Sequence, residues 1–298
     1  MVTSSLLSDV GNIAIYIFVL SSMFLTGLMV TIGDLVAPVR NRRLLTLSLV
    51  SNFILVPLIA LTLIAIIPMN PELAAGLLLV SIAAGAPSTA KVAQITGGNV
   101  AQAVSMTILM TIVTIVLMPF LLPFILEGAD AHPLYVLGNL VLLILVPILL
   151  GILIKSRAEP LAARFRPVTD LVSNISIAVI FLTYGILFLS QIGGIVSTAT
   201  GATAVSVAIL FTFAALGLTY LLGSFAKDAR QDLAFGAGFR NITAALVVVF
   251  AAFTDVQNDV FLMVLMVSIF AVIIVSILVG IIFKKQRDAG KKAKRSGA

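Results

Sequence analysis

Residues 85–98 read GAPSTAKVAQITGG, a run of small and helix-breaking residues with a lysine, Lys91, near its middle. The preceding run LAAGLLLVSIAA (73–84) carries no charge, and a long apolar run follows from Asn99. A second stretch of the same kind, FGAGFRNITAAL (235–246), carries Arg240. Both stretches place a basic residue beside small residues inside an otherwise apolar segment, and this pairing constrains the whole fold.

The composition is that of a membrane protein. The chain has 298 residues, of which 61% are hydrophobic and 10% are charged, whereas a soluble domain carries about 25% charged residues. Several stretches exceed the ~18 apolar residues that can cross a hydrocarbon layer of about 30 Å. The absence of cysteine excludes disulfides, thiolate chemistry and cysteine-ligated metals. We therefore predict an all-α polytopic membrane protein that forms a single transmembrane unit over 1–298.

The apolar runs predict nine transmembrane helices, and the basic residues predict their orientation. Apart from Lys91 and Arg240, every lysine and arginine falls in the first loop, in the loops after the fifth and seventh spans, or in the C-terminal segment 284–298. All of these lie on one side under this count, so the positive-inside rule places the N-terminus outside and the C-terminus inside a bacterial cytoplasmic membrane. The basic tail is expected to contact anionic lipid rather than nucleic acid. The predicted spans are 11–32, 44–67, 72–96, 99–126, 134–154, 168–192, 202–226, 230–252 and 259–283.

Lys91 and Arg240 occupy matching positions in the third and eighth spans. Each follows a cluster of small or helix-interrupting residues, 85–88 in one case and 236–238 in the other, and each span precedes a long apolar one. With nine spans, spans two to four and seven to nine run in opposite senses. Interrupted helices at corresponding positions of two inverted repeats are typical of the binding site of a secondary transporter.

A broken helix in lipid frees backbone groups that only protein or a water-filled cavity can satisfy. Half-helix N-termini favour anions and C-termini favour cations. Three interpretations stay open for Lys91 and Arg240: the side chain reaches the membrane interface, caps free carbonyls, or faces an anionic substrate. Arginine keeps its charge and binds carboxylates or sulfonates through two N–H groups, whereas a desolvated lysine can release its proton. Arg240 is thus the better candidate for fixing an anion, and Lys91 for coupling transport to protons.

Few polar residues surround these two cations, and they form the predicted site. Asn99, which opens the fourth span, is also suited to an N-cap. No metal ligand is predicted with any specificity. The candidate substrate-binding residues are Arg240, Lys91, Asn241, Thr243, Asn52, Ser88 and Thr89. The candidate ion-coupling or ion-substituting residues are Lys91, Arg240, Thr107, Asn99 and Gln94.

The motifs across 12–283 together resemble the bile acid:sodium symporter family. The similar stretches are MFLTGLMVTIGDL (23–35), SNFILVPLIALTL (51–63), GAPSTAKVAQITGGNVAQAVSMTIL (85–109) and FGAGFRNITAALVVV (235–249). The resemblance implies nine or ten helices, with two crossed, broken helices in a core domain and a separate panel domain. The core is expected over about 44–126 and 202–283, and the panel over about 11–32 and 134–192. It also implies transport of a small organic anion by alternating access.

The chain departs from the family at the sodium sites. The family binds two sodium ions near the crossing, through a glutamate and a glutamine of the second crossing helix, an asparagine of the first, and hydroxyl groups of the next helix. The glutamate and glutamine positions are Gly236 and Arg240 here, the asparagine position falls at or beside Lys91 when a short gap is allowed, and one hydroxyl position is Ala103. Asn52 and Thr107 remain compatible with the pattern. A sodium site needs several oxygen ligands and is helped by a carboxylate. The resemblance therefore implies that Lys91 and Arg240 replace the two ions electrostatically.

Proton coupling or facilitated exchange is accordingly favoured over sodium symport, and a sodium-coupled organic anion symporter is the alternative. A channel would need a continuous polar stripe, and a membrane enzyme would need a His, Asp/Glu or Cys cluster within the membrane. A receptor would bind without saturable uptake. We expect no cofactor beyond a sodium ion or a proton as coupling ion. The expected partners are a small organic anion and membrane lipid, and the sequence makes no prediction of oligomeric state.

Overall fold

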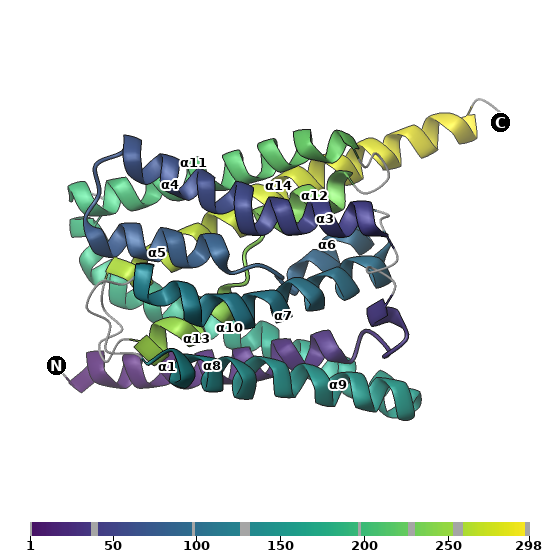
Figure 1. The fold of residues 1–298 in the computed structure, drawn as a ribbon, viewed down its shortest axis with the longest axis horizontal. Helices are drawn as coiled ribbons and strands as arrows, with labels where there is room; N and C mark the ends of the chain where they lie inside the picture. The colour runs from purple at the N-terminus through teal and green to yellow at the C-terminus, as the bar shows by residue number, and fades with distance from the viewer. Residues whose placement is uncertain are drawn as a thin grey trace.

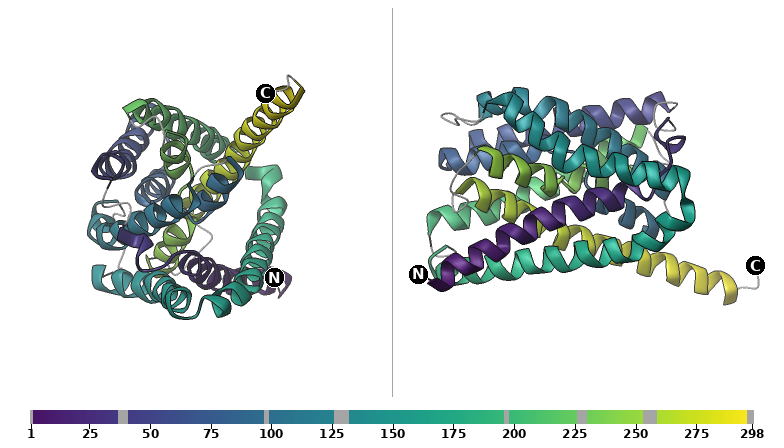
Figure 2. Two further views of the ribbon diagram at one scale, coloured as in Figure 1. Left: turned by 90° about the vertical axis from the view of Figure 1, so that its right-hand side faces the viewer. Right: turned by 90° about the horizontal axis from the view of Figure 1, so that it is seen from below.

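We describe the protein from a computed structural model, which covers residues 2–36, 41–96, 99–125, 132–195, 198–225, 230–252 and 259–295. Every regular element within these ranges is a helix. The helices run mostly along the long axis of one bundle, so that a view along this axis shows them nearly end-on (Figures 1 and 2). The prediction of an all-α protein is confirmed.

The elements follow one another in an order that matches the predicted spans. They are α1 (Val2–Gly27), the 3₁₀ turn η1 (Asp34–Val36), α3 (Arg42–Val50), the π-helical η2 (Ser51–Leu55), α4 (Val56–Ile66), α5 (Pro71–Ile82), α6 (Ser88–Thr96), α7 (Val100–Ile125), α8 (Pro133–Leu140), the π-helical η3 (Val141–Leu145), α9 (Val146–Arg157), α10 (Glu159–Ile195), α11 (Ala199–Leu222), the 3₁₀ turn η4 (Gly223–Phe225), α12 (Arg230–Gly238), α13 (Ile242–Ala252) and α14 (Asp259–Arg295).

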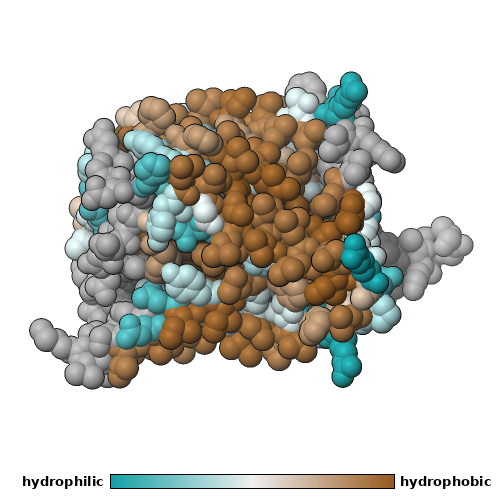
Figure 3. Space-filling model, turned by 60° about the horizontal axis from the view of Figure 1, so that its bottom comes forward, coloured by the Kyte–Doolittle hydropathy of each residue, from teal (hydrophilic) through white to brown (hydrophobic). Residues whose placement is uncertain are grey.

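Eight helical segments of the described chain are long and apolar enough to cross a membrane, and α5 is a further, shorter apolar helix. Large apolar side chains such as Phe120, Leu134 and Ile175 are exposed on the outside of the bundle. Figure 3 shows a broad apolar surface over the middle of one face, with hydrophilic residues toward its ends. These features are those of a multi-pass membrane protein, whose surface contacts lipid rather than water.

The predicted span 72–96 is not one continuous helix. The predicted total of nine transmembrane helices therefore stays a prediction. It corresponds to α5 and α6, separated by the non-helical residues 83–87. The predicted span 230–252 is likewise divided into α12 and α13 by residues 239–241. We call these segments the first and the second interruption. Both lie where small residues precede Lys91 and Arg240.

Three helices are longer than the predicted spans. α1 begins at Val2, α10 begins at Glu159 rather than 168, and α14 continues to Arg295. The segment predicted as a basic tail is therefore largely helical, and the end of α14 projects past the other helices (Figure 2). Hydropathy marks the part of a helix that lipid can cover, whereas backbone hydrogen bonding continues into polar sequence made of good helix formers.

Two helices contain a π-helical segment directly before a proline. The backbone N–H of Val56 donates to the carbonyl of Ser51, and that of Val146 donates to the carbonyl of Val141. Pro57 and Pro147 follow, and proline has no N–H to continue the regular α-helical pattern. The wider π-helical turn accommodates the hydrogen bond that the proline cannot make in each helix. In η2 this turn contains the buried Asn52.

Glycines let α1 and α9 approach closely. A Cβ added to Gly27 would lie 2.1 Å from the carbonyl oxygen of Ile148, and one added to Gly151 would lie 2.5 Å from that of Phe24. Small residues at such contacts allow helix backbones to pack against each other in membranes. α1 also packs along α10, while α5, α11 and α12 pack on or beside α14.

The two interrupted segments run in opposite directions. Asn70, just before α5, donates from its Nδ2 to Oδ2 of Asp259 over 2.5 Å, and the backbone N–H of Asp259 donates to Glu72 over 3.1 Å. Asp259 begins α14, which follows α13, so the start of α5 lies at the end of the bundle where α13 finishes (Figure 1). This arrangement agrees with the inverted repeats that the sequence predicts.

We expect Gly151→Ala to lower the free energy of unfolding by about 1–3 kcal/mol, because the new methyl group overlaps the backbone of α1. The matched control is Gly138→Ala in α8, where an added Cβ meets nothing within 4 Å. Since alanine favours the helix more than glycine does, the control should be neutral or stabilising. Thermal unfolding of the purified protein in detergent measures both changes, and equal effects would contradict the close contact.

Candidate functional site

The first interruption is built around Gly85. Its φ is 86°, the only positive φ among the described residues, and glycine adopts this region without steric cost. An added Cβ would lie 2.3 Å from Oγ1 of Thr111 and 2.5 Å from the carbonyl oxygen of Thr107. The chain therefore leaves α5 pressed directly against α7, where only glycine fits.

Threonines of α7 satisfy the backbone groups that the first interruption frees. Thr114 accepts a hydrogen bond from the N–H of Ala84 over 3.0 Å, and its hydroxyl lies 3.2 Å from the carbonyl oxygen of the same residue. Thr111 donates to the carbonyl of Gly85 over 3.1 Å. Buried backbone groups need such partners in lipid, where water is absent. Neither threonine was predicted from the sequence, although with Thr107 they recur on one face of α7.

The second interruption is bonded directly to the first. The backbone N–H of Asn241 donates to the carbonyl of Ala83 over 2.8 Å. The side chain of Asn241 accepts from the N–H of Ala244 over 3.0 Å, which caps the start of α13, and lies 3.4 Å from Oγ1 of Thr111. Asn241 is fully buried. It therefore holds the crossing together from within.

Arg240 lies at the crossing, with 6% of its surface exposed. Its Nε donates to the carbonyl of Val80 over 3.1 Å, and its Nη2 donates to that of Ser81 over 2.5 Å. Its Nη1 donates to Oδ1 of Asn52 over 2.8 Å and lies 3.4 Å from the carbonyl oxygen of Ala237. Four of the five guanidinium N–H groups thus have partners.

The guanidinium neutralises the ends of two half-helices. Val80 and Ser81 belong to the last turn of α5, and Ala237 to the last turn of α12. Helix C-termini carry partial negative charge, so a cation is stabilised there. No carboxylate pairs with Arg240, since the ion pair found in the described residues joins Lys155 and Glu159. Of the three interpretations left open for Arg240, carbonyl capping is what the structure contains, and reaching the interface is excluded.

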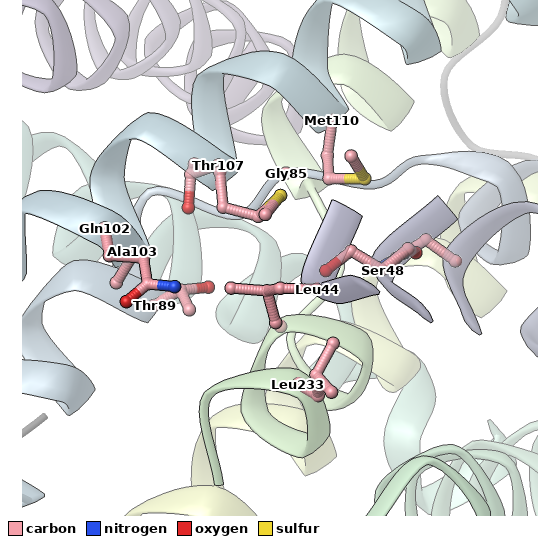
Figure 4. A pocket seen from close by; sticks show the side chains of 12 residues that line it. Leu44, Ser48, Gly85, Thr89, Gln102, Ala103, Thr107, Met110 and Leu233 are labelled. Atoms are coloured by element: carbon pink, nitrogen blue, oxygen red, sulfur yellow. Dashed lines mark hydrogen bonds between the residues drawn. The ribbon is translucent and has the colours of Figure 1, made fainter. Parts of the chain in front are cut away.

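A small cavity of ≈ 40 Å³ is lined by Asn52, and Figure 4 shows Ser48, Thr89 and other residues that line it. Its lining offers oxygen atoms but no carboxylate among the described residues. The hydroxyl of Thr89 is buried there without a hydrogen-bond partner. The lining residues are Leu44, Ser48, Asn52, Gly85, Thr89, Gln102, Ala103, Met106, Thr107, Met110, Leu233 and Gly236. The cavity therefore gathers the predicted residues Asn52, Thr89 and Thr107 with Gly236 and Ala103, two positions at which the family resemblance implies sodium ligands.

A larger cavity of ≈ 570 Å³ lies on the other side of the crossing, between α1 and α10 on one wall and α6, α13 and α14 on the other. Lys91 and Gln94 of α6 are exposed along it. Its polar lining residues are Ser22, Ser88, Lys91, Gln94, Arg166, Asp170, Ser173, Asn174, Arg240, Thr243 and Ser268. The cavity thus has an excess of positive over negative side chains.

Two half-helix N-termini also face the larger cavity. α6 begins at Ser88, and α13 begins at Ile242 with Thr243 next to it; all three residues line the cavity. The hydroxyl of Thr243 is buried and has no hydrogen-bond partner. At α13 the N–H groups of Ile242 and Ala244 already donate to Arg240 and Asn241. The helix dipole and the remaining N–H groups still make such ends favourable for anions. Together with the ammonium group of Lys91, they form an environment suited to a negatively charged group.

The structure divides the predicted site residues among three places. Asn52, Thr89 and Thr107 line the small cavity, whereas Lys91, Arg240, Ser88, Gln94 and Thr243 line the larger one. Asn241 and Asn99 line neither. Asn99 accepts from the N–H of Gln102 over 3.1 Å, which confirms it as the N-cap of α7.

Sequence reasoning missed the contribution of α10. Arg166, Asp170, Ser173 and Asn174 line the larger cavity from this helix. Their spacing places them on one helical face, and Ile177 and Phe181 continue it. This periodicity was the available signal, but the polar residues stand at the edge of an apolar run, where the predicted span 168–192 begins.

A family model described as "Sodium Bile acid symporter family" matches residues 15–198. The matched region is more than half of the chain and includes the first interruption and Lys91. No curated protein matches the chain significantly.

We expect Arg240→Gln to lower the free energy of unfolding by about 3 kcal/mol, because several buried carbonyls lose a charged donor. Arg240→Lys keeps the positive charge but loses the planar guanidinium, so its free energy of unfolding should lie between those of Arg240→Gln and the wild type. Arg164→Gln, an exposed arginine that lines neither cavity, is the control. Chemical unfolding in detergent gives the three values. If Arg240→Gln matches the control, the guanidinium does not hold the crossing.

Proposed function

Because the chain belongs to the sodium bile acid symporter family, we propose that it is a secondary transporter of a small organic anion, a carboxylate or a sulfonate. Symporters move solutes across membranes rather than convert them, so the protein is a transporter and not an enzyme by family. The observation that carries the choice of substrate is the ≈ 570 Å³ cavity in which Lys91 meets the N-termini of α6 and α13. Cavities of this size suit small molecules.

The proposed anion site uses backbone and side-chain donors together. The anionic group would lie between Ser88 at the start of α6 and Thr243 at the start of α13, within reach of the Lys91 ammonium. Thr243 supplies a buried hydroxyl that has no other partner. Arg240 contributes to the cavity wall, but its guanidinium is engaged with carbonyls and Asn52. Lys91 is therefore the proposed substrate-facing cation in this conformation.

We propose that Arg240 does the electrostatic work of a bound sodium ion, so that transport does not require sodium. Its charge is held by two backbone carbonyls and Asn52, ligands of the kind that sodium uses. The small cavity next to it has Gly236 where the family resemblance implies a glutamate. A sodium ion there would lack a carboxylate and would lie beside a fixed positive charge. Lys91 lines the larger cavity instead. We therefore propose that only Arg240 replaces a sodium ion electrostatically, and that Lys91 is the proton-coupling group.

The position of the cavity between two groups of helices supports a mechanism of alternating access. We propose that the panel, about 11–32 and 134–192, rocks against the core, about 44–126 and 202–283. The cavity lies near the end of the bundle where α10 begins, because Ala163 and Arg166 line it. With the proposed orientation, N-terminus outside and C-terminus inside a bacterial inner membrane, this conformation faces the cytoplasm.

Sodium-coupled symport of an organic anion is the second candidate. Asn52, Thr89 and Thr107 do supply oxygen atoms around the small cavity, and the unpartnered hydroxyl of Thr89 is available to a ligand. The absence of a carboxylate from this lining is the reason we place this candidate second.

Uptake by the protein reconstituted in liposomes tests the proposal. We expect saturable uptake of a radiolabelled short-chain carboxylate or sulfonate that persists when choline replaces sodium on both sides. Lys91→Gln should lower uptake at least tenfold, since it removes the charge that faces the anion. The control is Arg164→Gln, outside both cavities. If uptake requires a sodium gradient and does not change with a pH gradient, both sodium independence and proton coupling are contradicted.

A double variant tests the role of Arg240 directly. An added Cβ on Gly236 meets nothing within 4 Å, and the residue lines the small cavity, so a glutamate side chain has room there. We expect Gly236→Glu combined with Arg240→Gln to be stabilised by sodium chloride relative to choline chloride in thermal unfolding. The wild type should show no such difference. Sodium stabilisation of the wild type would contradict the proposal.

A further inference from the structure

We infer that four aromatic residues close the end of the bundle away from the larger cavity, and that they separate when the transporter opens there. They are Tyr16 of α1, Tyr184 of α10, Phe250 of α13 and Phe261 of α14, and we call them the aromatic seal. The inference rests on the proposed function, because alternating access requires one end to be closed while the other is open. With the proposed orientation, the seal lies at the outer end.

The four helices that carry the seal also line the larger cavity. On each of them the aromatic residue lies nearer the outer end, where the N-terminus, the end of α13 and the start of α14 are found (Figure 1). On α10, which runs toward this end, Tyr184 lies about one turn beyond the lining residue Phe181. On α14, which runs away from it, Phe261 lies about two turns before the lining residue Ser268. The cavity therefore ends beneath the rings.

Two ring contacts join α1 and α10 on one side to α13 and α14 on the other. The ring centroids of Tyr184 and Phe261 are 4.8 Å apart, and those of Tyr16 and Phe250 are 6.1 Å apart. Phe250 also meets Phe261 edge-on at 6.3 Å, so that the two contacts form one cluster with Tyr16 exposed at its edge. Such pairs are favourable beyond the apolar area that they bury. The rings thus attract each other across the line along which the proposed panel and core separate.

Tyr184 is fixed to the panel side of this line. Its hydroxyl donates to Oδ1 of Asn12 in α1 over 2.6 Å, and a Cβ added to Gly11 would lie 2.7 Å from its ring. Tyr184 is 4% exposed, and Phe261 is fully buried against it. When α1 and α10 move together, the Tyr184 ring moves with them, so the contact that breaks on opening is the one with Phe261.

An apolar contact of this kind can close a transporter and still open. Packed rings exclude water and charged solutes, because both lose their hydration there. A single ring pair is only weakly favourable, so its loss changes the balance between two conformations by about three- to tenfold. The aromatic seal is therefore expected to bias the conformation rather than to lock it.

Thiol labelling tests the seal without any substrate, since the chain has no cysteine. The reporter is Ser268→Cys, at a half-buried residue that lines the larger cavity. A membrane-impermeant maleimide is added to spheroplasts, which expose the outer end, and to inside-out vesicles, which expose the other. We expect fast labelling in the vesicles and slow labelling in the spheroplasts. The closed side is the one from which the reporter alone labels slowly.

Phe250→Leu and Phe261→Leu remove the ring contacts but keep an apolar side chain. In the Ser268→Cys background, we expect each to raise the labelling rate from the closed side about three- to tenfold. Neither should raise the rate from the open side. The matched control is Phe211→Leu in α11, a ring that is as deeply buried but belongs to the predicted core and not to the seal. It should change neither rate.

The outcomes separate this inference from the proposed function. The seal is overturned if neither variant speeds labelling from the closed side, or if Phe211→Leu does so equally. Faster labelling from both sides also overturns it, because a loosened fold would then explain the effect. Uptake of organic anions by liposomes is measured independently. A labelling shift without any uptake would leave the seal standing while the proposed function fails.

Discussion

A helix that is interrupted inside a membrane must find partners for the backbone groups that it frees, and the rest of this structure depends on how that is done. The carbonyls at the end of α5 bind the guanidinium of Arg240. Thr111 and Thr114 of α7 bind the groups of the first interruption. The backbone of Asn241 then joins the second interruption to the first. Because these partners come from α7 and from the second interruption, the crossing is a single bonded unit rather than two adjacent kinks.

This unit separates charge in a simple way. The C-terminal ends of α5 and α12 point at a permanent cation, so their negative potential is neutralised within the protein. The N-terminal ends of α6 and α13 have no such internal counter-charge and face the larger cavity. The same break that requires a cation on one side therefore provides, on the other, the half-helix N-termini at which we propose that the anion binds. Arg240 lies at the C-terminal ends of α5 and α12, and the proposed substrate lies at the N-terminal ends of α6 and α13.

The sequence was sufficient for features that depend on local composition. Small residues beside Lys91 and Arg240 predicted both interruptions, and Asn99 was recognised as a possible cap. It was not sufficient for features that depend on neighbours. Hydropathy could not extend α10 to Glu159, because lipid burial and helix formation obey different rules. The bond from Arg240 to Asn52 joins residues far apart in the chain, and no periodicity indicates it.

The bonding of Arg240 also bears on the energetics of a transport cycle. A cation that is part of the chain returns with the carrier and is never released, so it brings no gradient of its own. A monovalent anion carried without a proton then transfers net charge. A potential of 100 mV, negative inside, opposes its entry by about 2.3 kcal/mol and assists its exit by the same amount. Under the proposed sodium-independent function, coupling to a proton is therefore what would let the protein accumulate an anion, and without that coupling the membrane potential favours release of the anion from the cell.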